Sequence, residues 1–264
     1  MRRLGRDRGT TNPLRARDES VSERGRTDRK RGEDTGMSQT ERDDVVLIGH
    51  RGCAGQYPEN TVEAIGRASP HVDAVEVDVR RCASGELVVF HDAELDRLTE
   101  GTGRVADAEW DELRELTVLD SGEPIPRLDE ALRALPDGTA VNVEIKDRGV
   151  AGDALDAVGE ADAEAWFSSF RPKALATLRD RDPTTDRALL VADGSAERAA
   201  AAATDLGCVA VHPPIDLATE PGFVETVREA GLRVNAWTAT DRGDAEELLA
   251  AGVDGIIADR WDLF

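Results

Sequence analysis

The chain has 264 residues, of which 40% are hydrophobic and 4% aromatic, and its formal net charge is −21. This length suits one large domain or two small ones, and no run approaches the roughly 20 apolar residues that span a bilayer. The 54 acidic residues against 33 basic ones disfavour binding to nucleic acid or to an anionic membrane, and they fit a halophilic protein kept hydrated in concentrated salt.

The first 44 residues differ in composition from the rest. They hold 12 basic and 10 acidic residues and almost no aliphatic ones, which leaves 21 basic and 44 acidic residues in 45–264. We therefore expect 1–44 to be a disordered charged tail, with Met37 as a possible true start. An arginine-rich arm for nucleic acid is the alternative, which the interspersed acidic residues disfavour. No apolar segment follows Arg2 and Arg3, so we expect no Sec or twin-arginine signal and a cytoplasmic protein.

The pattern of the three cysteines does not indicate a disulfide or a zinc site. Cys53, Cys82 and Cys208 are odd in number, widely spaced and form no CxxC pair. We expect buried thiols instead of a disulfide framework or a zinc site.

From residue 45 onward, short β-branched and aliphatic runs alternate with amphipathic stretches rich in alanine and leucine. The runs predict eight strands, at 45–49, 74–79, 141–145, 165–170, 187–191, 208–211, 233–237 and 255–258. Several amphipathic stretches end in glycine just before the next strand, as helix C-caps do. This alternation predicts that 45–264 is one domain, a closed (β/α)8 TIM barrel. An open doubly wound sheet is the alternative, but no glycine-rich fingerprint follows the first strand.

The gap between the second and third of these strands is too long for one helix and its loops. It contains a further apolar run, LVVFHD (87–92), after the turn SGE. We expect residues 80–127 to form a small insertion on the catalytic face, after which the helix LDEALRAL (128–135) resumes the barrel.

Active sites of such barrels lie at the C-terminal ends of the strands, where this sequence places three carboxylates. Glu76 and Asp78 stand two apart on the second strand, so both side chains point to one face, and Glu144 ends the third strand. Converging carboxylates cannot all stay ionised without a counter-charge. A hard divalent cation, Mg²⁺ or Ca²⁺, would supply that charge. A salt bridge to arginine is the alternative for any one of them taken singly.

Basic residues accompany these carboxylates at the strand ends. Lys146 stands two residues after Glu144, and 45–264 contains only one other lysine, Lys173. A lysine kept in an arginine-rich composition suggests a compact point charge on a phosphate. Arg51, after the first strand, would join it there.

Two strands that each end in histidine complete the pattern. His50 follows the first strand and His91 the inserted one. Beside a metal and a phosphate, the two would supply a general base and a general acid for cleaving a P–O bond. His71 and His212 lack such neighbours and are expected to be structural. Trp237, at the end of the seventh strand, is a candidate substrate contact.

These residues belong to a series of motifs that resembles the glycerophosphodiester phosphodiesterase family. The motifs are HRG (50–52), PENT (58–61), EVDV (76–79), ASGELVVFHD (83–92), RLT with GTG close behind (97–103), IPRLDEAL (125–132), EIK (144–146), SSF (168–170), WT (237–238) and GVDGII (252–257). The resemblance implies a TIM barrel with a small insertion after strand two. It also implies metal-dependent hydrolysis of glycerophosphodiesters to glycerol phosphate and an alcohol, in glycerol and phospholipid metabolism. The free glycerol hydroxyl of the substrate would attack phosphorus, and water would then open the resulting cyclic phosphate.

The same resemblance assigns individual roles. It makes Glu76, Asp78 and Glu144 metal ligands and His50 and His91 the acid–base pair, and it places Arg51 and Lys146 near the phosphate. Glu59 and Asn60, in PENT, are expected to support these groups from behind, although Asn60 is equally suited to cap the first helix.

The chain departs from the family at its C-terminal end. The family usually has Thr-Asp-x-Pro after the eighth strand, whereas this chain has Ala258, Asp259, Arg260 and Trp261 and stops at Phe264 without an eighth helix of normal length. The contacts of this last loop and the oligomeric state are left open.

Two other functions compete with this one. A phospholipase-D-like enzyme acting on lysolipids could use the same centre, but it needs an apolar channel or a membrane-binding surface that this acidic, aromatic-poor chain does not suggest. A non-catalytic phosphate-binding module would not need two histidines. We therefore expect a small-molecule glycerophosphodiester as the partner, with no nucleic acid and no stable membrane anchor.

Overall fold

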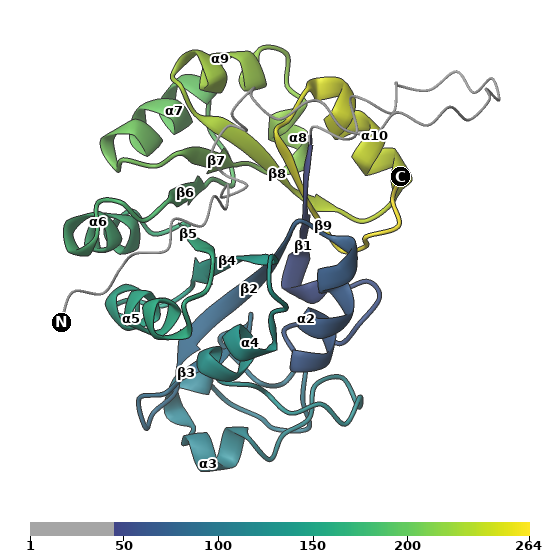
Figure 1. Ribbon diagram of the computed structural model, residues 1–264, viewed down its shortest axis with the longest axis vertical. Coiled ribbons are helices and arrows are strands. Elements are labelled where there is room, and N and C mark those ends of the chain that lie inside the picture. Colours follow the sequence, from purple (N-terminus) through teal and green to yellow (C-terminus); the bar gives the residue numbers. More distant parts are fainter. Residues whose placement is uncertain (1–44) are drawn as a thin grey trace.

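The computed structural model describes residues 45–264 (Figure 1). The tail 1–44 and the possible start at Met37 lie outside the described residues. Three free cysteines are present in the described part and all are buried, as expected. No helix in 45–264 is long and apolar enough to cross a membrane.

Eight parallel strands close into a barrel, so the predicted TIM-barrel fold is confirmed. The strands are β1 (Val46–Gly49), β2 (Ala74–Arg81), β4 (Ala140–Ile145), β5 (Ala165–Ser169), β6 (Arg187–Leu190), β7 (Ala210–His212), β8 (Arg233–Ala239) and β9 (Gly255–Ala258). They are hydrogen-bonded in the order β1-β9-β8-β7-β6-β5-β4-β2, and pairing of β1 with β2 closes the ring.

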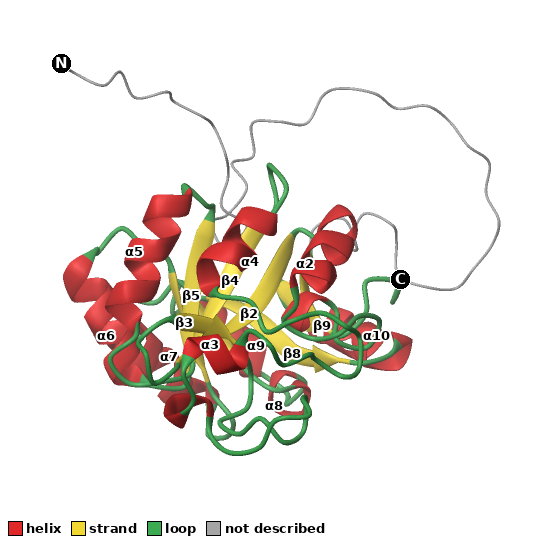
Figure 2. Ribbon diagram, turned by 90° about the horizontal axis from the view of Figure 1, so that it is seen from below, coloured by secondary structure: helices red, strands yellow, loops and turns green. Residues whose placement is uncertain are grey.

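Helices surround the barrel as an outer layer (Figures 1 and 2). They are α2 (Val62–Ala68), α4 (Leu128–Ala134), α5 (Ala151–Ala161), α6 (Pro172–Arg181), α7 (Ala196–Asp205), α8 (Ile215–Ala218), α9 (Phe223–Glu229) and α10 (Arg242–Ala251). The short α8 was not predicted. The predicted glycine stop is found after α10, where Gly252 has φ +78°, a conformation that costs glycine little. No helix follows β9 in the described residues.

The expected insertion is present after β2, which runs two residues further than predicted. Strand β3 (Leu87–Val89) pairs antiparallel with the end of β2, Val79 opposite Val89, and a 3-10 turn (Val105–Asp107) and a short helix, α3 (Trp110–Leu113), follow. These elements enclose a small apolar core of their own, which includes Phe90, Leu98 and Leu113. The insertion is therefore a packed subdomain that holds the end of β3 against the barrel.

The interior of the barrel is closed at the N-terminal ends of the strands. Trp166 is fully buried there, in a cluster with Val46, Ile48, Ala74, Ala140, Ala188, Ala210 and Ile257. Along β2 the inward side chains change from Ala74 to Glu76 and Asp78, because alternate residues of a strand share a face. The barrel interior is thus apolar at the N-terminal ends of the strands and acidic at their C-terminal ends.

Candidate active site

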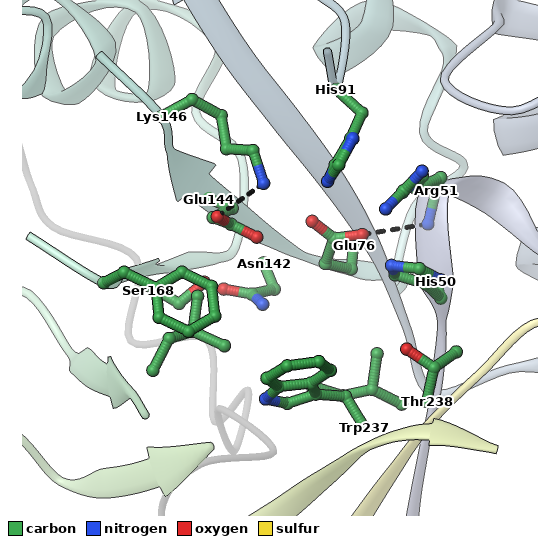
Figure 3. Close-up of a pocket in the computed structure, with 13 residues that line it drawn as sticks. His50, Arg51, Glu76, His91, Asn142, Glu144, Lys146, Ser168, Trp237 and Thr238 are labelled. Atoms are coloured by element: carbon green, nitrogen blue, oxygen red, sulfur yellow. Dashed lines mark hydrogen bonds and ion pairs between the residues drawn. The ribbon is translucent and has the colours of Figure 1, made fainter. Parts of the chain in front are cut away.

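A pocket of about 210 Å³ lies at the C-terminal ends of the barrel strands. Its lining residues are His50, Arg51, Glu76, His91, Asn142, Glu144, Lys146, Ser168, Phe170, Leu190, Trp237, Thr238 and Ile257. Seven predicted site residues are among them (Figure 3). The other three, Glu59, Asn60 and Asp78, lie behind the pocket wall and contact the lining residues.

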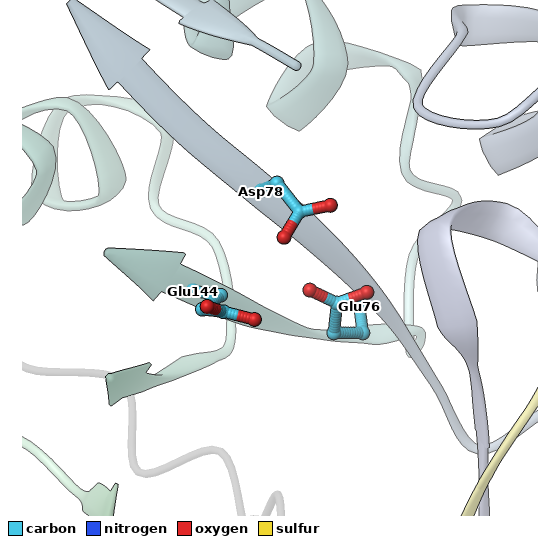
Figure 4. A group of neighbouring side chains, drawn as sticks. All are labelled: Glu76, Asp78 and Glu144. Atoms are coloured by element: carbon cyan, nitrogen blue, oxygen red, sulfur yellow. The ribbon is translucent and has the colours of Figure 1, made fainter. Parts of the chain in front are cut away.

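The three predicted metal ligands meet at one place (Figure 4). One oxygen from each of Glu76, Asp78 and Glu144 lies within 4.8 Å of the others. The side chains of Glu76 and Asp78 are almost fully buried, and that of Glu144 is 12% exposed. Burial, together with repulsion from Asp78 and Glu144, raises the pKa of Glu76 well above its ordinary value. Burial and Asp78 likewise raise the pKa of Glu144 to about 7.

Two cations compensate Asp78 in particular. The ammonium Nζ of Lys146 is 3.1 Å from Asp78 Oδ1 and 2.8 Å from Glu144 Oε1. The guanidinium Nε of Arg51 is 3.3 Å from Asp78 Oδ2. Burial alone would raise the pKa of Asp78, but these two cations hold it well below its usual range. The two cations therefore favour the ionised form of Asp78, whereas the pKa values of Glu76 and Glu144 stay raised.

The residues present fit a divalent cation. Glu76 Oε2 accepts a hydrogen bond of 2.9 Å from the backbone N–H of Arg51, whereas Glu76 Oε1 is buried and has no hydrogen-bond partner among the described residues. A buried carboxylate oxygen without a partner is costly, and burial together with repulsion from Asp78 and Glu144 also raises the pKa of Glu76. A hard cation bound by three carboxylates would remove both penalties.

The HRG turn places His50 and Arg51 at the rim of the pocket. Arg51 has φ +50°, and Gly52 follows with φ +76°. A Cβ on Gly52 would lie 2.8 Å from the Cβ of Ala64, so only glycine lets the turn pack this closely on α2. The turn directs the backbone N–H of Arg51 at Glu76 and its side chain at Asp78.

Each of the two histidines is held by a carboxylate that the sequence argument missed. His50 Nδ1 is 2.7 Å from Asp259 Oδ1, and His91 Nδ1 is 2.6 Å from Asp92 Oδ1. An ionised carboxylate only accepts hydrogen bonds, so each Nδ1 carries the proton and each Nε2 is left for a ligand. Asp92 could have been found because it follows His91 directly; Asp259 is 209 residues from its partner.

A charged network connects the two sides of the pocket. Arg97 donates to Asp92, at 2.5 and 3.1 Å, and to Glu59, at 3.0 Å through each of two nitrogens. Glu59 also accepts from Arg51 at 2.8 Å. These bonds to Arg97 and Arg51 lower the pKa of Glu59 although burial opposes them. Arg97, in the RLT motif, thus ties the His91 side of the site to the Arg51 side.

Asn60 supports Asp78 and does not cap the first helix. Its Nδ2 donates to Asp78 Oδ2 at 2.8 Å, and its Oδ1 accepts from the backbone N–H of Asp78 at 3.2 Å. The cap of α2 is Thr61, whose Oγ1 accepts from the backbone N–H of Ala64. The alternative role considered for Asn60 is therefore wrong.

The environment of His91 favours its neutral form in the free protein. Burial lowers the pKa of His91, the nearby cations Lys146 and Arg51 lower it further, and Asp78 opposes them. An anion bound in the pocket would raise the pKa of His91, as Asp78 does. The side chain is 31% exposed, so the ring is accessible to a ligand.

The aromatic side of the pocket is formed by Trp237. Its ring meets that of Phe170 edge-on, with 5.8 Å between centroids, and its Nε1 donates to the carbonyl of His212 at 2.9 Å. His212 itself is fully buried, which lowers its pKa to about 3. His71 stacks on Trp261. Neither histidine lines the pocket.

The chain resembles known proteins over most of its length. Residues 50–263 match the Glycerophosphoryl diester phosphodiesterase family. A glycerophosphodiester phosphodiesterase of Caldanaerobacter subterraneus is 32% identical over 81% of this chain and 94% of that protein. The crystal structure of such an enzyme from Thermotoga maritima has a TM-score of 0.72 at 31% identity, over 83% of this chain and 96% of that one. An Oleispira antarctica phosphodiesterase, solved in complex with the product sn-glycerol-3-phosphate, has a TM-score of 0.72 at 29% identity, covering 81% and 92% of the two chains.

Proposed function

Since the chain belongs to the glycerophosphoryl diester phosphodiesterase family and is an enzyme of that class, we propose that it hydrolyses glycerophosphodiesters with a divalent cation and two histidines. The observation that carries the proposal is the joint placement of three carboxylates, two cations and two carboxylate-held histidines around one pocket. The products are glycerol phosphate and an alcohol. An enzyme with these substrates would act in glycerol and phospholipid metabolism.

The cation would be held by Glu76, Asp78 and Glu144. All-oxygen ligation suits Mg²⁺ or Ca²⁺, and the unpartnered Glu76 Oε1 supports a ligand at this point. The ion would supply positive charge to the phosphoryl oxygens as negative charge develops on them. Glu59 and Asn60 would keep these ligands in place. Glu59 holds Arg51, which contacts Asp78, and Asn60 donates to Asp78 directly.

The phosphate would lie between Lys146 and Arg51. Lys146 already contacts two carboxylates, so its ammonium is fixed in the pocket wall, with a side chain 12% exposed. Arg51 is held by Glu59 in the same way. Preplaced cations stabilise negative charge on phosphorus oxygens without having to reorganise. Trp237 supplies an apolar surface opposite them, against which the carbon skeleton of the substrate can pack.

The proton transfers would be divided between the two histidines. His50 Nε2 takes the proton of the attacking glycerol hydroxyl, and Asp259 stabilises the resulting imidazolium. His91 Nε2 gives its proton to the oxygen of the leaving alcohol as the P–O bond breaks, which leaves a cyclic phosphate. Water then opens that ring with the two roles exchanged. His91 must be protonated for the first step, and the anionic substrate raises its pKa against the lowering caused by burial.

The geometry disfavours a lysolipid substrate. Large apolar side chains that are exposed in 45–264 are Val62, Leu119, Phe170 and Phe264. Of these four, only Phe170 lines the pocket. A surface for lipid requires a contiguous apolar patch.

Product analysis tests the proposed reaction. Glycerophosphocholine, glycerophosphoethanolamine and glycerophosphoglycerol are incubated with the protein, and ³¹P NMR follows the phosphodiester resonance. We expect it to be replaced by that of glycerol phosphate, with release of the free alcohol. Formation of phosphocholine or phosphoethanolamine instead would contradict the proposal, because the other P–O bond would have been broken.

A further inference from the structure

Two polar side chains at the floor of the pocket have no partner. Asn142 and Ser168 both line the pocket, and each is only 1% exposed. Within the described part of the chain, Asn142 Oδ1 and Ser168 Oγ make no hydrogen bond. Figure 3 places both beneath Glu144 and Glu76. Two polar groups are therefore buried in the pocket floor without satisfying their hydrogen-bonding capacity.

The strand register brings this polar floor next to the carboxylates. On β4, Asn142 pairs with Glu76 of β2, and on β5, Ser168 pairs with Glu144 of β4. Each polar residue thus stands on the strand beside one of the glutamates. Asn142 also shares its strand face with Glu144, two residues further on.

Two donors beside the carboxylates, the ammonium of Lys146 and the backbone N–H of Arg51, are engaged by the carboxylates themselves. Lys146 donates to Glu144 and contacts Asp78, and the backbone N–H of Arg51 donates to Glu76. An amide oxygen such as Asn142 Oδ1 can only accept. Buried oxygens of this kind are normally bonded to protein or to ordered water. Both residues line the pocket, so water or a ligand bound there can supply the donor.

We propose that Asn142 and Ser168 hold water molecules of the hydration shell of the divalent cation. This inference rests on the cation proposed above. One oxygen from each of the three carboxylates supplies three of the six ligands that Mg²⁺ requires, and Mg²⁺ commonly keeps several waters. Water bound to a cation is a strong hydrogen-bond donor, and Asn142 Oδ1 and Ser168 Oγ are the acceptors beside it. The floor thereby orients the hydrated ion and raises its affinity, as outer partners of metal ligands do.

The neighbouring serine provides a matched comparison. Ser169 is fully buried, as Ser168 is, but its Oγ donates to the carbonyl of Ile145 at 2.7 Å and accepts from the backbone N–H of Arg171 at 3.0 Å. It does not line the pocket. Ser169→Ala removes a hydroxyl from the same strand without touching the floor.

Calorimetric titration of the full chain with MgCl₂, in the absence of substrate, tests the inference. Wild type is compared with Ser168→Ala, Asn142→Leu, Ser169→Ala and Glu144→Gln. Loss of a partner of a metal-bound group typically weakens metal affinity about 10–100-fold, and we expect about tenfold for Ser168→Ala and Asn142→Leu. Ser169→Ala should bind as wild type does. Asn142→Asp keeps an acceptor oxygen and adds negative charge, so its affinity should equal or exceed that of wild type.

The outcomes separate this inference from the cation proposal. If wild type binds no Mg²⁺, or if Glu144→Gln binds it equally well, the cation site itself is contradicted. If those two behave as proposed but Ser168→Ala and Asn142→Leu keep wild-type affinity, only the inference is overturned. Weaker binding of sn-glycerol 3-phosphate with unchanged Mg²⁺ affinity would also overturn it, by assigning the floor to a substrate hydroxyl. Thermal melting of each variant confirms folding, and if Asn142→Leu does not fold, Ser168→Ala decides.

Discussion

Arg97 donates to both carboxylate oxygens of Asp92, the residue that holds His91. The same guanidinium donates to both oxygens of Glu59, which holds Arg51. The bonds to Arg97 and His91 lower the pKa of Asp92 to about 2, so it stays ionised and acts only as an acceptor. Arg97 does not line the pocket. It holds Asp92 and Glu59, which in turn hold the pocket residues His91 and Arg51.

Replacing Arg97 should slow catalysis more than it weakens substrate binding. Arg97→Gln frees Asp92 and Glu59, and a shift of about 1 Å in a reacting group can cost 10²-fold in rate. We expect kcat to fall roughly 10–100-fold with a smaller change in KM, and Arg97→Lys to recover part of the loss. Arg114→Gln is the control, because Arg114 lies in the same insertion and, within 45–264, forms ion pairs only with the exposed Asp111 and Glu115. A kcat for Arg97→Gln equal to that of the control would refute the positioning role.

The proposed roles of His91 as acid and His50 as base predict that the two alanine variants lose activity differently on substrates with different leaving groups. His91→Ala removes the proton donor, which commonly costs about 10²–10⁴ in rate, but nitrophenol leaves without protonation. We therefore expect His91→Ala to lose much less activity on a nitrophenyl glycerophosphodiester than on glycerophosphoethanolamine. His50→Ala should lose the same factor on both substrates. Steady-state rates on the two substrates decide, and equal losses for His91→Ala would remove its role as the acid.

The raised pKa of Glu144 predicts a pH-dependent stability of the metal-free protein. Its carboxyl has a pKa of about 7 in the folded state against 4.5 for the ordinary group. A raised pKa stabilises the fold fully below pH 4.5, and the contribution is lost as the pH rises through 7. Glu144→Gln lacks this contribution. In urea unfolding, the free energy of unfolding of wild type should fall by about 1–3 kcal/mol relative to that of the variant between pH 5 and 8.

Comparison with the variant matters because another group titrates in the opposite sense. Burial lowers the pKa of His212 to about 3, so its contribution is present above pH 6.5 and lost as the pH falls. It is common to both proteins and cancels in the difference. Parallel pH curves for wild type and Glu144→Gln would contradict the electrostatic description of the site, and saturating Mg²⁺ should abolish the difference in slope.

The acidity of the chain predicts stabilisation by salt. Residues 45–264 contain 44 acidic and 21 basic residues, and their repulsion extends over a Debye length of about 30 Å at 0.01 M salt but only about 3 Å at 1 M. Melting temperature and activity should rise from dilute buffer to 1 M KCl. Sucrose at equal osmolality should not reproduce the rise. A melting temperature that is flat or falls with KCl would argue against adaptation to salt.

The sequence was sufficient for the barrel and for the residues that point into it. Apolar runs separated by amphipathic segments predicted the strands, and the two-residue spacing of Glu76 and Asp78 predicted their common face. Because active sites of such barrels lie at the C-terminal strand ends, Glu144 and Lys146 were predicted to lie at the same place. Each of these inferences depends only on local spacing and on a property of the whole fold.

The supporting contacts could not be predicted in the same way. His50 and Asp259 are 209 residues apart and meet because β1 and β9 are neighbours in the closed ring. Arg97 lies in an irregular part of the insertion, where no periodicity specifies its direction. The inward phase of Asn142 with Glu144 was readable from VNVEI, but its lack of a partner is a property of packing. For Asn60 the capping preference of its residue type gave a wrong alternative, because the adjacent Thr61 caps the helix.

The metal dependence of catalysis is tested most directly by removing and restoring the ion. The protein is dialysed against EDTA, and hydrolysis of glycerophosphoethanolamine is followed by ³¹P NMR before and after addition of MgCl₂ or CaCl₂. Turnover should be abolished in the metal-free protein and restored by one of the two ions, and Glu144→Gln should need a higher concentration for the same rate. Undiminished turnover after complete removal of divalent metal would contradict the role proposed for Glu76, Asp78 and Glu144.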